Sequence, residues 1–248
     1  MDPTATRIHE ALQAVALLRA QHLADRELLQ ASADVKRFQA GRFRATYADV
    51  LASPRYKTAA AFFLHELYSD RDYAERDQQF ARIASTIAKL FPQAVVNTAA
   101  ALAEVHALTE QLDDLMARQW LASLKSAPEL DENMRYIACW RQVGDMQARH
   151  KQLEVVLLLG RELNRLTRMP GLRTLLKMMR RPAAVAGLSS LQGFLEAGFD
   201  AFAGMRGADD FLKLIEQRET EWIATLFDDD TVTCETKLGN LLGSYPSS

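Results

Sequence analysis

The 248-residue chain has little of the material on which the commonest kinds of site depend. Its 2 cysteines, Cys139 and Cys234, lie far apart in the sequence, so we expect neither a disulfide framework nor a cysteine-based zinc site. With 30 Lys plus Arg against 32 Asp plus Glu, the net charge of −2 gives no overall preference for nucleic acid. Only 11 glycines and 7 prolines are present, which leaves little sequence for long flexible linkers.

Long hydrophobic runs and common catalytic motifs are also missing. The longest strongly apolar run, Val155 to Leu159, is much shorter than the roughly 20 residues that a membrane-spanning helix needs. The first residues, Met1 to Thr4, contain no basic region leading into an apolar run, so we expect a cytoplasmic protein without a signal peptide. The sequence contains no Walker loop, dinucleotide-binding glycine motif, serine nucleophile elbow or zincin motif. These absences favour a non-enzymatic binding or interaction protein, although an enzyme stays open.

Apolar residues recur at helical spacing along nearly the whole chain, and no strand-like alternation lasts four residues. Hydrophobic residues make up 48% and charged residues 25% of the sequence, as is usual for a soluble globular protein. We predict an all-α fold of about eight or nine helices in orthogonal or bundle-like packing, built as a single domain over residues 1–236. Residues 237–248 contain two glycines and a proline and are predicted to form a poorly ordered tail.

Two long stretches of helical periodicity need an interruption. The first runs over residues 3–51, and the polar residues 32–34 are the predicted place of a break. The second runs over residues 131–167, where Gly144 or Gly160 is predicted to produce a kink.

Aromatic and charged side chains are concentrated at the junction between two predicted helices. Asp72, with Glu75 three residues later, forms a capping box that would begin the second of these helices. Arginines alternate with aspartates here, and their permanent charge opposes a bound cation while it suits bidentate pairing with carboxylates. We therefore predict a structural corner. Its residues are Phe62, Phe63, Tyr68, Asp72, Arg76 and Asp77.

This junction, residues 62–77, resembles a family of uncharacterised all-helical proteobacterial proteins. The likeness continues in residues 103–113, which read Ala-Glu-Val-His-Ala-Leu-Thr-Glu-Gln-Leu-Asp, and returns in residues 169–171 and 188–202. It therefore covers most of the chain. The resemblance implies an all-helical cytoplasmic domain and carries over no catalytic residue, because the family has no established activity.

His106, Glu110 and Asp113 are spaced so that they lie on one side of a predicted helix. An imidazole with two carboxylates could bind a transition metal or form a general base with its orienting group. The alternative is a solvated helix edge, and the Glu-x-x-His motif of di-iron bundles is absent. The histidines could also provide axial haem ligands, but no Cys-x-x-Cys-His motif occurs. We predict no metal and no cofactor, and keep a metal- or haem-dependent enzyme or sensor at these three residues as the alternative function.

Residues 161–181 contain seven cations and one anion, a net charge of +6, with leucines and methionines between them. Residues 209–235 contain nine anions and two cations, a net charge of −7. The two segments could pair within the fold or across a homodimer, or the basic one could bind an acidic protein partner. Nucleic acid or a membrane surface is less favoured. The candidate partner-binding residues are Arg165, Arg168, Arg173, Lys177 and Arg180.

Overall fold

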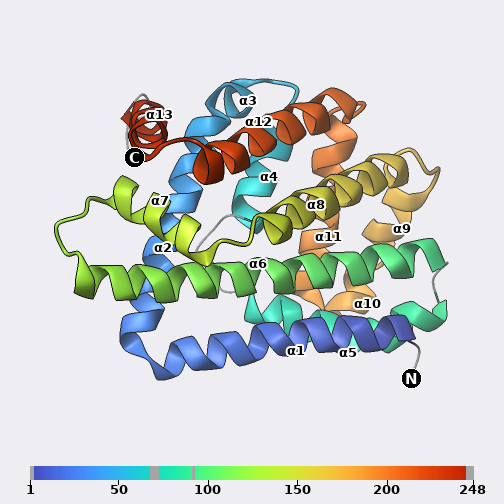
Figure 1. Ribbon diagram of the computed structural model, residues 1–248. Coiled ribbons are helices and arrows are strands. Elements are labelled where there is room, and N and C mark those ends of the chain that lie inside the picture. The colour runs from blue at the N-terminus through green and yellow to red at the C-terminus, as the bar shows by residue number, and fades with distance from the viewer. Residues whose placement is uncertain (1–2, 68–72, 91–92, 244–248) are drawn as a thin grey trace.

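The computed structural model describes residues 3–67, 73–90 and 93–243 (Figure 1). All regular secondary structure in these ranges is α-helical, which confirms the predicted fold class. The thirteen helices of the described ranges are α1 (Pro3–Ala24), α2 (Arg26–Thr46), α3 (Ala48–Ala52), α4 (Lys57–Leu67), α5 (Ala74–Leu90), α6 (Gln93–Ser126), α7 (Glu132–Val143), α8 (Met146–Leu166), α9 (Leu172–Met178), α10 (Arg180–Val185), α11 (Ser189–Gly204), α12 (Asp209–Asp228) and α13 (Thr231–Gly243). This is more than the eight or nine predicted, because local caps divide the longer stretches of helical periodicity.

The first predicted stretch is interrupted at Asp25, and the break predicted at residues 32–34 is wrong. Asp25 has extended backbone angles and its Oδ1 accepts hydrogen bonds from the backbone N–H groups of Glu27 and Leu28, at 3.0 and 3.1 Å. Such an aspartate satisfies N–H groups that have no partner within the helix, so a new helix can begin there. Ser32, within the predicted break, is instead a buried residue of α2.

The kink predicted near Gly144 is a complete break between α7 and α8. Gly144 has a left-handed backbone conformation with φ of 69°, which glycine adopts without the steric cost that a side chain brings. Asp145 then caps α8 by accepting a hydrogen bond from the N–H of Ala148 at 2.9 Å. The chain thereby changes direction between two helices that both pack on α6.

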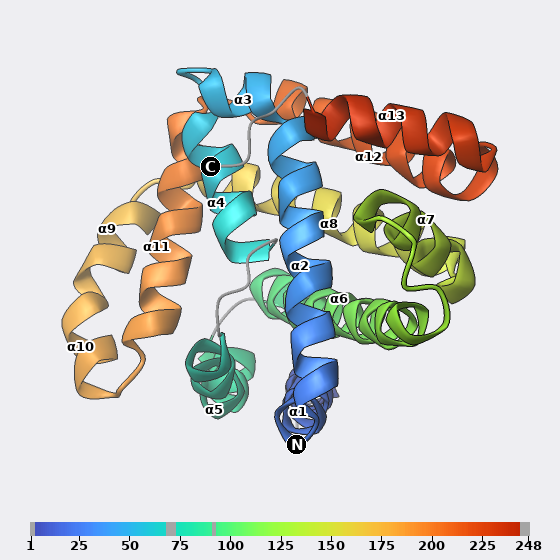
Figure 2. The same ribbon diagram turned by 90° about the vertical axis from the view of Figure 1, so that its left-hand side faces the viewer.

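The longest helix, α6, is the axis of the fold. It packs against α1, α2, α5, α7 and α8. Figure 1 shows α1 lying along α6, while α2 crosses it steeply (Figures 1 and 2). Val105 and Leu112 are buried on α6, whereas Leu115 is 45% exposed.

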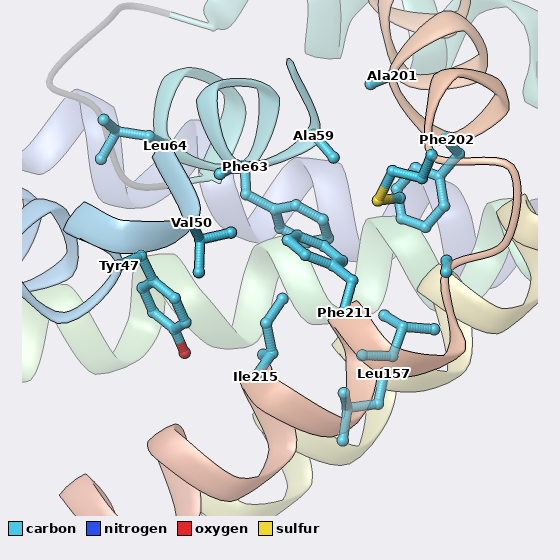
Figure 3. Packing of buried hydrophobic residues seen from close by; sticks show 14 of the residues in the cluster. Tyr47, Val50, Ala59, Phe63, Leu64, Leu157, Ala201, Phe202, Phe211 and Ile215 are labelled. Atoms are coloured by element: carbon cyan, nitrogen blue, oxygen red, sulfur yellow. The ribbon is translucent and has the colours of Figure 1, made fainter. Parts of the chain in front are cut away.

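Three clusters of buried apolar side chains lie around this axis. One joins α4, α11 and α12, and Figure 3 shows Phe63 facing Phe202 and Phe211 within it. The ring centroid of Phe63 lies 6.0 Å from that of Phe202 and 5.7 Å from that of Phe211. The second cluster contains Trp120, and the third surrounds Ile8 of α1.

The prediction of a poorly ordered tail from residue 237 onward is wrong for residues 237–243. Residues 237–243 belong to α13, where Leu238 is fully buried against the second cluster. Burial of this leucine stabilises the last helical turns despite Gly239 and Gly243. Residues 244–248 lie outside the described part of the chain.

Helices α9 and α10 lie at the edge of the molecule next to α11 (Figure 2). Within the described ranges, no helix combines the length and apolar character needed to cross a membrane.

Truncation of Phe63 tests the first cluster. We expect Phe63→Ala to lower the free energy of unfolding by about 3–5 kcal/mol, because it leaves a cavity between two other phenylalanine rings. Val185→Ala is the matched control, since Val185 is 92% exposed and exposed substitutions usually change stability by less than about 0.5 kcal/mol. Equal denaturation midpoints for the two variants would contradict this packing.

Candidate functional site

Of the predicted triad on α6, Glu110 and Asp113 are buried and His106 is partly buried, and each side chain has a separate partner. His106 Nε2 lies 2.9 Å from Asp77 Oδ2 of α5. The Lys36 ammonium on α2 donates to both Glu110 oxygens, at 3.0 and 3.1 Å. Gln39, one turn further along α2, donates to Asp113 Oδ1 at 3.1 Å. The three residues therefore share a side of α6, as predicted, but they do not converge on one point.

This arrangement favours a structural role for the triad over a metal site. In the described part of the chain, no group of three or more His, Cys, Asp or Glu side chains is placed to hold a metal ion. Burial acts to raise the pKa of Glu110, but the Lys36 ammonium, together with His106 and Arg19, lowers the pKa overall. Glu110 is therefore an ionised carboxylate in a buried ion pair. The solvated helix edge, the other interpretation of this pattern, is wrong for Glu110 and Asp113, which are 8% and 6% exposed.

Asp77, one of the predicted corner residues, connects three helices. Its carboxylate lies 2.8 Å from Arg19 of α1, 2.9 Å from His106 of α6 and 3.5 Å from Arg76 of its own helix. Burial alone would raise its pKa, but the hydrogen bond from His106 and the charges of Arg19 and Arg76 lower it. Asp77 thus holds α1, α5 and α6 together as an anion.

Arg76 provides the second half of the corner. Its guanidinium donates to Glu66 at the end of α4, at 2.9 Å, and lies over the rings of Tyr73 and Phe194, 4.2 and 4.7 Å from their centroids. It therefore links α4, α5 and α11. Tyr68 and Asp72, the other polar residues assigned to this corner, lie outside the described residues.

The phenylalanines of the corner pack α4 onto α11. Phe63 is buried in the first cluster, and the ring of Phe62 lies 5.7 Å from that of Phe194. A Cβ at Gly198 would approach Phe62 Cζ to 3.0 Å, so a larger residue there would require the Phe62 ring to shift. These contacts favour the structural interpretation of the segment.

The basic segment does not pair with residues 209–235 in the described part of the chain. Arg165 pairs with Glu162 at 2.8 Å, Arg173 with Asp200 at 3.0 Å, and Arg180 with Glu196. Hydrogen bonds from Arg180 and Gln192 lower the pKa of Glu196 to about 2. The expected pairing with the acidic segment inside the fold is therefore wrong for these three arginines, because nearer anions on α8 and α11 take their charge.

Exposed apolar side chains accompany these cations. Leu175, Met178, Met179 and Val185 are 48%, 69%, 43% and 92% exposed. All lie on α9 and α10 or between them, among exposed cations. We name this surface the α9–α10 face. It consists of Leu175, Met178, Met179 and Val185 together with Arg168, Arg173, Lys177, Arg180 and Arg181.

A second candidate region is a pocket of about 60 Å³ where α2, α6, α7, α8 and α12 meet. Charged side chains line it, although each is at least nine-tenths buried. Arg42 donates to both Glu219 oxygens, at 3.3 and 2.8 Å, and Tyr47 donates to the same carboxylate at 2.9 Å. Arg149 lies over the ring of Trp140, 4.1 Å from its centroid. The charged lining residues are Arg42, Asp113, Arg149 and Glu219.

Three polar atoms at this pocket make no hydrogen bond within the described part of the chain. They are Trp140 Nε1, the hydroxyl of Tyr136 and the second carboxylate oxygen, Oδ2, of Asp113. Their residues are 7%, 0% and 6% exposed. Burial raises the pKa of the Tyr136 hydroxyl, which lies within the electrostatic influence of all four charged lining residues. Of these atoms, Trp140 Nε1 is fully buried, and a buried polar atom without a partner is costly, so the pocket can take a polar ligand there.

Of these pocket residues, sequence reasoning identified only Asp113. Arg42 and Glu219 are 177 positions apart, and such a pair cannot be derived from spacing along one helix. Tyr136 and Trp140, four positions apart, do lie on one face of α7. Two aromatic side chains with polar atoms on one helix face could have indicated this pocket from the sequence. Such a pair is, however, equally typical of an ordinary core.

The family model described as a domain of unknown function (DUF8198) matches residues 18–233, which include every candidate region described above. No curated protein and no solved structure matches the chain. The match shows that most of the chain belongs to one family of unknown function.

Neutralising Asp77 tests the buried network. We expect Asp77→Asn to lower the free energy of unfolding at neutral pH by about 3 kcal/mol, because Arg19 and His106 lose their buried anion. The folded-state pKa of Asp77 is lowered, so its contribution to stability is present above the unfolded pKa and is lost as pH falls through the folded pKa. Unfolding measured from about pH 5 downward should therefore depend less on pH in the variant than in the wild type.

Glu154→Gln is the control, because Glu154 pairs with Lys151 on the surface, where both side chains are at least 60% exposed. It should follow the wild-type pH dependence, since exposed pairs contribute little. A variant at Asp77 that behaved like this control would show that the network is not needed for stability.

Proposed function

This chain belongs to the DUF8198 family, and we propose that it is a non-enzymatic interaction protein whose α9–α10 face binds an acidic protein partner. The observation that carries the proposal is the coincidence of exposed methionine, leucine and valine side chains with cations on two short helices. Exposed apolar groups surrounded by charge are typical of interaction surfaces. Methionine side chains adapt readily to the shape of a partner.

The charge of this region supports an acidic partner. Residues 161–204, from α8 through α11, contain seven cations and three anions, a net charge of +4. Because three arginines pair locally, four cations have no ion pair within the described ranges. These are Arg161, Arg168, Lys177 and Arg181. Charge of one sign attracts a partner of the opposite sign and sets its orientation, while the apolar side chains supply area to bury.

A protein suits this face better than a membrane. Helices α9 and α10 have 7 and 6 residues, so neither provides the long apolar stripe of an interfacial membrane helix. Anions of a protein partner can instead approach single cations beside single apolar contacts. A second copy of this chain fits the same chemistry, because α12 carries Asp209, Asp210 and Glu216 as exposed anions.

A metal- or haem-dependent function centred on His106, Glu110 and Asp113 is the less favoured proposal. Each of these side chains already has a protein partner on α5 or α2. A metal would therefore have to displace the Lys36 ammonium and the contact between His106 and Asp77.

Site-specific photo-crosslinking in the native host tests the proposed face. A crosslinking amino acid in place of Val185 is expected to capture a protein, whereas the same amino acid in place of Val232 should not. Val232 is 71% exposed but lies on α13, at the other side of the molecule from α9 (Figure 1). Mass spectrometry should map the adduct to an acidic segment of the captured protein. If the partner is a second copy of this chain, that segment should lie within residues 209–235.

Charge reversal tests whether this crosslinking depends on the cations of the α9–α10 face. The double variant R168E/K177E should reduce the adduct strongly, because like charges then face the acidic partner. Its free energy of unfolding should change by less than about 0.5 kcal/mol, since both side chains are exposed. The matched control R26E/R44E reverses two exposed arginines of α2 and should leave the adduct unchanged. Adducts only with lipid or nucleic acid, or an adduct unaffected by R168E/K177E, would contradict the proposal.

A further inference from the structure

The pocket between α2, α6, α7, α8 and α12 has the composition of a small-molecule site. Charged groups are rarely buried unless they are paired. Here two positive and two negative side chains surround a space that is not filled by protein atoms. With Arg42 and Glu219 joined to each other, Arg149 and Asp113 provide one further charge of each sign.

The three polar atoms without hydrogen bonds define what a guest must offer. Trp140 Nε1 only donates, so it needs an acceptor. Oδ2 of the Asp113 carboxylate needs a donor, and the Tyr136 hydroxyl can act in either way. A ligand must therefore carry both a hydrogen-bond acceptor and a hydrogen-bond donor. Arg149 also favours the acceptor. A ligand with a positive and a negative end suits this lining, because burial raises the pKa of Asp113 and a cationic donor would stabilise its carboxylate form.

The size of the pocket limits the guest further. A buried water occupies roughly 10–15 Å³ of such space, so the pocket of about 60 Å³ corresponds to a molecule of roughly four to six non-hydrogen atoms. Thr109, Gln152 and Val156 are lining residues that remain half-buried, and they connect the pocket with the surface at α6 and α8.

We propose that this pocket binds a small zwitterion of the size of glycine, with its carboxylate toward Arg149 and Trp140 Nε1 and its ammonium group toward Asp113. Neutral charge overall, opposite charge at the two ends and about five non-hydrogen atoms satisfy the groups that line the pocket. This site is separate from the α9–α10 face and does not depend on the function proposed for that face.

Calorimetric titration of the full chain with glycine tests this assignment. A ligand of this size can reach a Kd of about 1 mM or tighter, and binding should also raise the melting temperature. Acetate carries only the carboxylate and methylammonium only the ammonium group, so each should bind at least about tenfold more weakly than glycine.

Conservative variants locate the binding. Asp113→Asn and Trp140→Phe should each weaken glycine binding about tenfold or more, because each removes a hydrogen bond to a charged group. Tyr136→Phe removes a hydroxyl that has no described protein partner, so this variant should keep its stability in the absence of glycine and still lose affinity. Trp120→Phe is the matched control, because Trp120 is buried but does not line the pocket. It should bind glycine as the wild type does.

Three results would overturn the assignment. The first is the absence of heat and of a change in melting temperature at about 10 mM glycine, roughly ten times the weakest expected Kd. The second is unchanged glycine affinity in folded Trp140→Phe and Tyr136→Phe. The third is acetate or methylammonium binding as tightly as glycine, which would assign the pocket to a simple ion.

Discussion

The fold depends on the pairing of carboxylates and a histidine that α6 carries into the interior. A helix of 34 residues that packs against α1, α2, α5, α7 and α8 has little surface left for polar side chains. Removing a charge from water costs several kcal/mol unless a partner compensates it. His106, Glu110 and Asp114 therefore require Asp77, Lys36 and His22 at set positions on the neighbouring helices. These pairs specify how the neighbours are placed, which apolar contacts alone do less selectively.

The apolar clusters then occupy the spaces between these polar contacts. The cluster around Phe63 holds α4, α11 and α12, whereas the cluster around Trp120 holds α7 and α13. Arg42 and Glu219 connect α2 with α12 at the border between the two. The central pocket lies at the same border, because planar guanidinium groups and carboxylates cannot fill space as completely as interlocking aliphatic side chains. A gap in packing and a concentration of charge thus have one cause.

Helical periodicity predicted the all-α fold, and it placed His106, Glu110 and Asp113 on one side of α6. It could not identify their partners, since His106 and Asp77 are 29 positions apart and Glu110 and Lys36 are 74. Periodicity also misplaced the end of α1, because Asp25 interrupts the helix while the apolar pattern continues across it. The basic segment was recognisable from charge alone, but its local pairing with Glu196 and Asp200 depends on α11 lying beside α9. The role of each residue that the sequence patterns identified is therefore determined by its tertiary contacts.

Helix α8 runs from the central pocket towards the α9–α10 face. Arg149 near its beginning lines the pocket, and Arg165 near its end belongs to the basic segment. A ligand in the pocket can influence the α9–α10 face only if α8 has two arrangements that differ in affinity for it. Its packing on α12 opposes such movement, because Gly160 approaches Leu212 so closely that an added Cβ would lie 2.5 Å from Leu212 Cδ2. Close packing of this kind favours one position of α8, so the two regions should bind independently.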